Sequence, residues 1–211
     1  MKRHTILKKL LIFFTTLLMV ASTAHADTYQ EVQSIVFQSE HILQDFSTDP
    51  KYSGLKRHFS AAKAIFIIPQ MLKGGFLIGG SGGTGVLVSR DMKTGEWSYP
   101  VFYNMGSVSI GLQVGAESSQ LVLLVMTEKG MRSLLSTSFK LGADATIAAG
   151  TLGAGAKITT ADIISFAKSK GAFGGATVEG AIVEPKESWN YIYYQQPASI
   201  IDILYNHKYT N

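Results

Sequence analysis

Residues 74–85 carry seven glycines and contain two overlapping motifs known from nucleotide binding and catalysis. Gly80-Ser-Gly82-Gly-Thr-Gly85 matches the dinucleotide fingerprint G-x-G-x-x-G, and Gly79-Gly-Ser81-Gly-Gly83 matches the nucleophile elbow G-x-S-x-G. Both motifs need a helix directly behind them, to meet a pyrophosphate or to hold the serine on a sharp turn. Residues 86–95 have instead the pattern of a strand and a turn. We therefore interpret the glycines as a tight strand–turn–strand and keep a hydrolase that uses Ser81 as an alternative.

The remaining chemistry-bearing residues show no catalytic or metal-binding spacing. After residue 26 the histidines are His41, His58 and His207, which fall on separate predicted elements, and the chain has no cysteine to complete a zinc site. Asp144 and Asp162 occupy outward positions of predicted strands, so we expect them to be solvated surface acids. The sequence thus predicts no catalytic residue, no metal ligand and no cofactor.

One local charge bias stands out between Pro50 and Gly74, where five basic residues and no acid are interleaved with apolar ones. A basic side chain near an anionic bilayer contributes about 1 kcal/mol, so five give on the order of 3–5 kcal/mol, enough for weak, reversible docking. The alternative is a solvated helix face that balances the acidic helix before it. The five basic residues are Lys51, Lys56, Arg57, Lys63 and Lys73.

The first 26 residues have the three-part layout of a secretory signal peptide. Four basic residues precede an apolar run over residues 10–20, and Ala24-His25-Ala26 supplies an A-x-A cleavage site. Cleavage after Ala26 would leave 15 basic and 15 acidic residues, because all four basic charges of this segment depart with it. A formally neutral chain gives little support for nucleic-acid binding. We expect a periplasmic or secreted protein.

The elements that must position these residues follow from hydrophobic periodicity. Residues 28–46 show the apolar stripe of a helix, which Asp49-Pro50 ends, and a second short helix is expected over residues 53–63. Residues 65–68 are predicted as a buried strand that Pro69 ends, and residues 121–126 as a strand buried on both faces. Residues 107–116 and 139–149 alternate with a period of two, which predicts one strand each.

Short helices are expected at residues 128–137, 185–194 and 197–205. Many strands with few helices between them predict an α+β fold. Its centre would be a mainly antiparallel, strongly curved β-sheet, barrel- or sandwich-like, with N-terminal helices and short C-terminal helices. We divide the chain into the signal peptide (1–26), a helical segment (27–60) and a glycine-rich β body with C-terminal helices (61–211), the last two forming one domain.

Motifs along nearly the whole of this domain resemble the SYLF domain family. The resemblance begins at Ala62-Lys-Ala-Ile-Phe-Ile-Ile-Pro69 and continues through the glycine-rich stretch and Trp97-Ser-Tyr-Pro100. Gly111-Leu-Gln-Val-Gly-Ala-Glu117 and Ser169-Lys-Gly-Ala-Phe-Gly-Gly175 follow in the family's order. With its leader, the chain looks like an exported bacterial member, related to the yeast endocytic actin-binding SYLF proteins.

The resemblance implies a non-enzymatic lipid-binding module whose partner is an anionic phospholipid or phosphoinositide membrane. It favours the five basic residues as the head-group site, with Lys63 and Lys73 inside family motifs and Lys51, Lys56 and Arg57 just ahead of them. The helix over residues 28–46 carries Glu31, Glu40 and Asp45, which departs from a membrane-binding helix. The alternative is an interaction protein that meets a protein partner through an exposed sheet edge or its aromatic tail (Trp189, Tyr191, Tyr193, Tyr194), with actin as the least favoured partner.

Overall fold

The computed structural model describes residues 28–76, 78–110, 115–150, 160–171 and 178–209. The predicted signal peptide lies outside these residues. Eight strands form one sheet in the order β5-β8-β3-β2-β1-β4-β7-β6, and every neighbouring pair is antiparallel except β6 and β7. The strands are β1 (Ala64–Phe76), β2 (Ile78–Ser89), β3 (Val101–Ile110), β4 (Gly115–Val125), β5 (Phe139–Lys140), β6 (Ile147–Ala149), β7 (Ile163–Gly171) and β8 (Ile182–Pro185).

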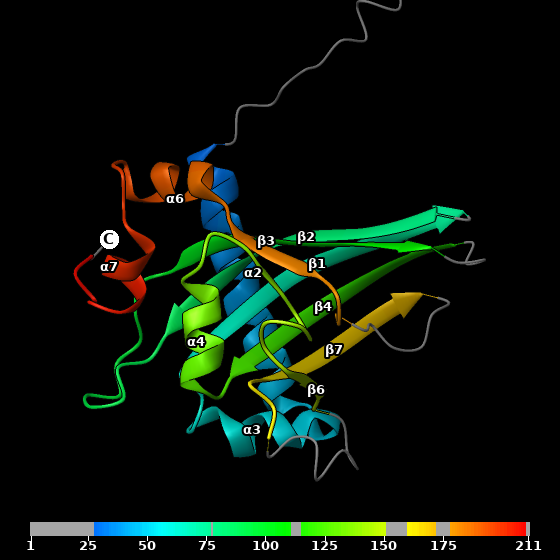
Figure 1. Ribbon diagram of the computed structural model, residues 1–211, viewed down its shortest axis with the longest axis horizontal. Coiled ribbons are helices and arrows are strands. Elements are labelled where there is room, and N and C mark those ends of the chain that lie inside the picture. Colours follow the sequence, from blue (N-terminus) through cyan, green and yellow to red (C-terminus); the bar gives the residue numbers. More distant parts are fainter. Residues whose placement is uncertain (1–27, 77, 111–114, 151–159, 172–177, 210–211) are drawn as a thin grey trace, which may run out of the picture.

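The sheet curls strongly into a half-barrel with helices packed around it (Figure 1). The N-terminal helices are α2 (Tyr29–Thr48), the 3-10 turn η1 (Pro50–Tyr52) and α3 (Ser53–Phe59). The later helices are α4 (Glu128–Leu134), α6 (Glu187–Tyr194) and α7 (Ile200–Leu204). This arrangement confirms the predicted α+β class, the strongly curved and mainly antiparallel sheet, and the helices at both ends of the chain.

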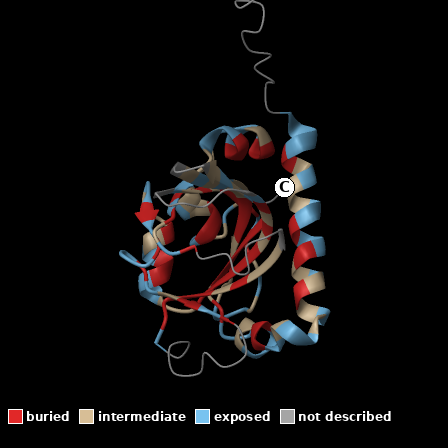
Figure 2. Cartoon of the chain, turned by 90° about the vertical axis from the view of Figure 1, so that its right-hand side faces the viewer, coloured by how far each residue is buried: buried red, intermediate tan, exposed pale blue. Residues whose placement is uncertain are grey.

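Helix α2 begins where the sequence predicts, because Thr28 forms a capping box with Glu31. The Thr28 side-chain oxygen accepts a hydrogen bond from the Glu31 backbone N–H (3.2 Å), and the Glu31 carboxylate accepts one from the Thr28 N–H (2.8 Å). The helix runs along one side of the molecule with its buried residues turned toward the sheet (Figure 2). It ends before Pro50, in accordance with the Asp49-Pro50 break.

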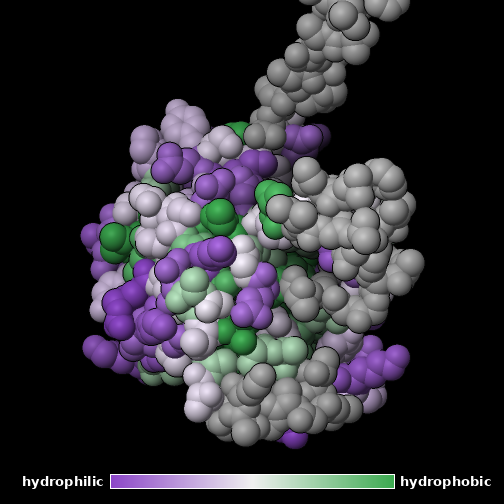
Figure 3. Space-filling model, turned by 45° about the vertical axis from the view of Figure 1, so that its right-hand side comes forward, coloured by the Kyte–Doolittle hydropathy of each residue, from purple (hydrophilic) through white to green (hydrophobic). Residues whose placement is uncertain are grey.

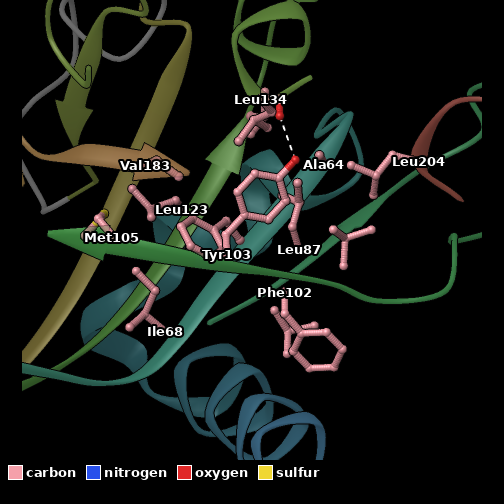
Figure 4. Packing of buried hydrophobic residues seen from close by; sticks show 14 of the residues in the cluster. Ala64, Ile68, Leu87, Phe102, Tyr103, Met105, Leu123, Leu134, Val183 and Leu204 are labelled. Atoms are coloured by element: carbon pink, nitrogen blue, oxygen red, sulfur yellow. Dashed lines mark hydrogen bonds between the residues drawn. The ribbon is translucent and has the colours of Figure 1, made fainter. Parts of the chain in front are cut away.

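The core lies on both faces of the sheet because side chains of a strand alternate between faces. On one face, Ile65 and Ile67 of β1 pack with Ile42 and Phe46 of α2 and with Leu55 of α3. The opposite face holds the larger cluster, which Figure 4 shows around Tyr103. The Tyr103 hydroxyl donates a hydrogen bond of 2.6 Å to the Leu134 carbonyl of α4. Residues 121–125 of β4 are all buried, as predicted for a strand covered on both faces.

Pro69 does not end the first strand, contrary to the prediction. Strand β1 continues to Phe76, and its pairing register with β2 and β4 shifts between residues 67 and 72. A bulge is a position where a proline is tolerated inside a sheet, since no ladder hydrogen bond from its nitrogen is required. The expected pair of strands is present, but β1 ends at Phe76 and β2 begins at Ile78, so the motif glycines lie inside β2 and not between the two strands.

The two strands predicted from period-two alternation are also wrong in extent. Residues 107–116 are divided between the end of β3 and the start of β4, with residues 111–114 outside the described part of the chain. Residues 139–149 contain the short β5 and β6 separated by a turn, in which Gly142 has a φ of +85°. The Asp144 carboxylate stabilises this turn by accepting a hydrogen bond of 2.6 Å from the Lys140 N–H. Alternation alone does not reveal such a turn, because apolar residues on both sides of it still point into the core.

Candidate functional site

The glycine motifs lie in a geometry that serves neither nucleotide binding nor nucleophilic catalysis. Gly79 to Gly85 are consecutive residues of β2, which continues to Ser89 without a helix. Ser81 pairs with Ser107 of β3, and their hydroxyl oxygens are 2.8 Å apart. A nucleophilic serine needs a base within hydrogen-bond reach, and another serine hydroxyl is a poor one. The structure therefore places these glycines within one strand of the sheet and not at the turn of the strand–turn–strand that we predicted.

The histidines lie on separate elements, His41 on α2, His58 on α3 and His207 after α7. Within the described ranges, no three histidine, aspartate or glutamate side chains group closely enough to hold a metal ion. Asp144 is exposed, as predicted.

Asp162 is buried, which corrects the prediction of a solvated surface acid. It lies just before β7, and its carboxylate accepts hydrogen bonds from the Thr127 hydroxyl (2.5 Å), the Thr146 hydroxyl (2.8 Å) and the Thr146 N–H (2.9 Å). The Lys129 ammonium lies 3.5 Å away. Burial disfavours the charged carboxylate, but these hydrogen bonds and Lys129 outweigh burial and lower its pKa to about 2. The carboxylate thereby joins the start of α4 to β6 and β7.

Three of the five predicted head-group residues lie together on the segment Pro50–Phe59, which we call the basic segment. Lys51 belongs to η1, Lys56 and Arg57 belong to α3, and all three are exposed. The neighbouring acid Asp49 accepts a hydrogen bond of 3.0 Å from the Lys51 N–H, and Lys168 of β7 lies 3.9 Å from its carboxylate. Lys56 and Arg57 lie in the last turn of α3, where a positive charge interacts favourably with the negative end of the helix dipole. They can therefore stabilise the helix without any ligand.

The other two predicted residues lie elsewhere. Lys63 precedes β1 and is paired with Glu128 of α4 at 2.7 Å. Lys73 lies ten residues further along β1, which at about 3.3 Å per residue separates the two by roughly 30 Å. Lys73 stands directly opposite Ser81 on one neighbouring strand and the buried Glu117 on the other. The structure therefore divides the five residues into one exposed group of three and two separate positions.

A groove between α2 and α3 adjoins the basic segment, and sequence reasoning did not find it. Its volume is about 610 Å³. On the α2 side it is lined by Glu40, Leu43, Gln44 and Ser47, and on the α3 side by Leu55, Lys56 and Phe59. The α2 positions share the spacing i, i+3, i+4, i+7 of one helix face, but only Leu43 among them is apolar, so no hydrophobic pattern in the sequence marks the groove.

The aromatic tail considered as a protein-binding surface is mostly core. Trp189, Tyr193 and Tyr194 are buried, and Tyr193 packs on Phe102 with ring centroids 5.3 Å apart. Tyr191 alone of the four is exposed. Figure 3 shows a face of the molecule on which hydrophobic residues reach the surface among hydrophilic ones. Among the described residues, no helix is both long and apolar enough to cross a membrane.

The curled sheet and its surrounding helices define an α+β domain of the SYLF type. Residues 106–211, half of the chain, match the family model described as "Ysc84: Las17-binding protein actin regulator". The chain therefore belongs to the Ysc84 family, in agreement with the resemblance found in its motifs.

The relatives in this family are longer proteins. The chain is 28% identical over 174 residues to the human SH3 domain-containing YSC84-like protein 1, covering 78% of this chain and 51% of the human protein. It is 36% identical over 136 residues to Protein YSC84 of Saccharomyces cerevisiae, covering 60% of this chain and 29% of the yeast protein. The chain thus spans about half the length of its vertebrate relatives and less than a third of the yeast one. No solved structure matches it.

Proposed function

We propose that the protein is a non-enzymatic module that docks reversibly on anionic phospholipid or phosphoinositide membranes through the basic segment. The observation that carries the proposal is the exposure of Lys51, Lys56 and Arg57 on one short segment. Asp49, the acid that precedes this segment, is engaged by Lys168 and by the Lys51 backbone N–H. Guanidinium and ammonium groups bind phosphate oxygens through charge-assisted hydrogen bonds. Three such residues supply about 3 kcal/mol in total, which gives weak and salt-sensitive binding.

Removing the three charges should weaken binding to anionic vesicles. We expect the variant Lys51→Ala/Lys56→Ala/Arg57→Ala to bind phosphatidylglycerol or phosphoinositide vesicles about 100-fold more weakly, since 1.4 kcal/mol corresponds to a factor of ten. Co-sedimentation with vesicles at low and physiological salt measures this, with phosphatidylcholine vesicles as the neutral reference. Wild-type binding should decline as salt rises.

A matched control removes the same number of charges from other elements. Lys93, Arg132 and Lys140 are exposed and lie on the β2–β3 connection, α4 and β5. Their triple alanine variant should retain vesicle binding within about threefold of wild type. Equal losses in both variants would show that overall charge, and not the basic segment, determines binding. No loss in the first variant would show that the assigned surface is wrong.

A protein partner is the second candidate, because the family model is described as a Las17-binding protein and actin regulator. A yeast relative of 36% identity is likewise named LAS seventeen-binding protein 3. For this chain, exposed Tyr191 borders a hollow of about 580 Å³ between α6 and α7, which would suit a protein contact. A stable complex in pull-down experiments, lost in Tyr191→Ala and accompanied by no vesicle binding, would favour this candidate.

We further propose that the protein is exported and that cleavage follows Ala26. The support is the arrangement of basic, apolar and small residues at the N-terminus. N-terminal sequencing of the protein from the cell envelope or the medium tests this. Recovery of an intact N-terminus in the cytoplasm would exclude it.

A further inference from the structure

The groove between α2 and α3 combines apolar side chains with one cation, Lys56, on its α3 side. Leu55 forms its floor and is completely buried, while Leu43 and Phe59 are half-buried on opposite walls. Phe59 is held against Trp97 with ring centroids 5.6 Å apart, which fixes the α3 wall. The volume of about 610 Å³ lies within the range of about 300–1,000 Å³ of typical small-molecule sites.

The charged part of the groove connects it to the proposed membrane surface. Lys56 lines the groove itself, and Arg57 and Lys51 lie on the same basic segment. Glu40 lies on the α2 wall, so the positive charge is confined to the α3 side. A ligand that joins an anion to an apolar body would suit this groove, with its anion on the α3 side beside Lys56.

We infer that this groove holds one acyl chain of an anionic phospholipid, whose phosphate contacts Lys56 on the α3 side. This inference rests on the proposed function and makes it more specific. Docking would then combine two contributions. One is the attraction between the anionic membrane and the basic segment, and the other is apolar contact between the groove and the acyl chain of one lipid. The occupant is a phospholipid because Lys56 offers a positive charge to its phosphate and Leu43 and Phe59 offer apolar surface to its acyl chain within the same groove.

The affinity for soluble short-chain lipids should depend on chain length. Each buried methylene adds a fixed increment to binding, so dioctanoyl-phosphatidylglycerol should bind about tenfold more tightly than dihexanoyl-phosphatidylglycerol if one chain is buried. Calorimetric titration of the whole protein, below the concentration at which either lipid forms micelles, measures the ratio. Equal affinities for the two lipids would overturn the inference.

Two variants of α2 locate the effect. Leu43→Ser removes apolar surface from the groove and should reduce the chain-length ratio to near one. Phe37→Ser is the matched control, because Phe37 lies on the same helix, is 68% exposed and does not line the groove. It should leave the ratio unchanged. An equal reduction in both variants would assign the acyl contact to the outer face of α2 and overturn the groove assignment.

The failures of the two proposals are distinguishable. Salt-sensitive vesicle binding without chain-length dependence would leave membrane docking intact and exclude the acyl site. Chain-length dependence that disappears in Leu43→Ser, without any binding to anionic vesicles, would confirm the groove and overturn membrane docking. As a second readout, bromine on the acyl chain should quench the fluorescence of Trp97 in the variant Trp189→Phe, because Trp97 packs on the groove residue Phe59. Absence of quenching would contradict the acyl site even if Leu43→Ser folded poorly.

Discussion

Replacing Asp162 with alanine is expected to lower the free energy of unfolding by about 2–4 kcal/mol. The substitution removes the acceptor for the Thr127 hydroxyl and for both the N–H and the hydroxyl of Thr146. A buried hydrogen-bond donor that loses its acceptor destabilises the folded state by the full free energy of removing it from water. Domains of this size are stable by about 5–15 kcal/mol, so the loss is a large fraction of the total. Urea unfolding of the wild type and variant measures it.

The same carboxylate should make the protein sensitive to acid. Its pKa in the folded state, about 2, is below the value of 3.8 expected without the fold. Because the folded-state pKa is depressed, the ionised carboxylate stabilises the protein fully above about pH 4, by about 2 kcal/mol. That stabilisation is lost as the pH falls from about 4 toward 2. Asp162→Asn should lower stability at pH 7 and remove this part of the pH dependence.

Asp144 provides the matched control for both effects. It is an aspartate of the same region, exposed, and accepts a hydrogen bond from the Lys140 N–H. Asp144→Asn should cost under about 1 kcal/mol, as expected for an exposed turn. If Asp162→Asn were no more damaging than Asp144→Asn, the carboxylate would not join α4 to β6 and β7 as the structure indicates.

The second large effect is expected for Gly85→Ala, at about 3 kcal/mol of lost stability. A Cβ atom on Gly85 would overlap the Ile67 carbonyl oxygen and lie 2.7 Å from Ile68 and 2.8 Å from Phe66. These atoms belong to β1 where its pairing register with β2 shifts, just after Ile67. A backbone carbonyl cannot rotate away as a side chain can, so the strand itself must shift. Thermal and urea unfolding measure the loss.

Gly80→Ala tests whether the effect comes from that close approach. Gly80 lies in the same strand, but a Cβ atom there would meet only the Ser107 carbonyl oxygen at 3.6 Å, an ordinary contact. Because glycine inside a strand is less favourable than alanine, this change should be neutral or stabilise by about 0.5 kcal/mol. Similar losses at both positions would mean that backbone flexibility, and not space beside the bulge, explains the glycine at position 85.

The local features of this protein follow from its sequence because they depend on neighbouring residues. Thr28 and Glu31 are three residues apart, so the capping box that begins α2 is formed within one turn. The continuous apolar run in β4 requires burial on both faces wherever the strand is placed. The strand pattern after Gly85 already argued against both glycine motifs, because each needs a helix at that point. The excess of basic residues between Pro50 and Gly74 was equally visible.

The tertiary structure alone decided how distant residues meet. It assigned Lys51, Lys56 and Arg57 to one exposed segment, while it paired Lys63 with Glu128 and placed Lys73 roughly 30 Å along an extended strand. It buried Asp162 among partners that are 16 and 35 residues away in the chain. The groove exists because α2 and α3 lie side by side on the same face of the sheet. Such contacts depend on the register and curvature of the sheet, which arise from all eight strands together and from no single stretch of sequence.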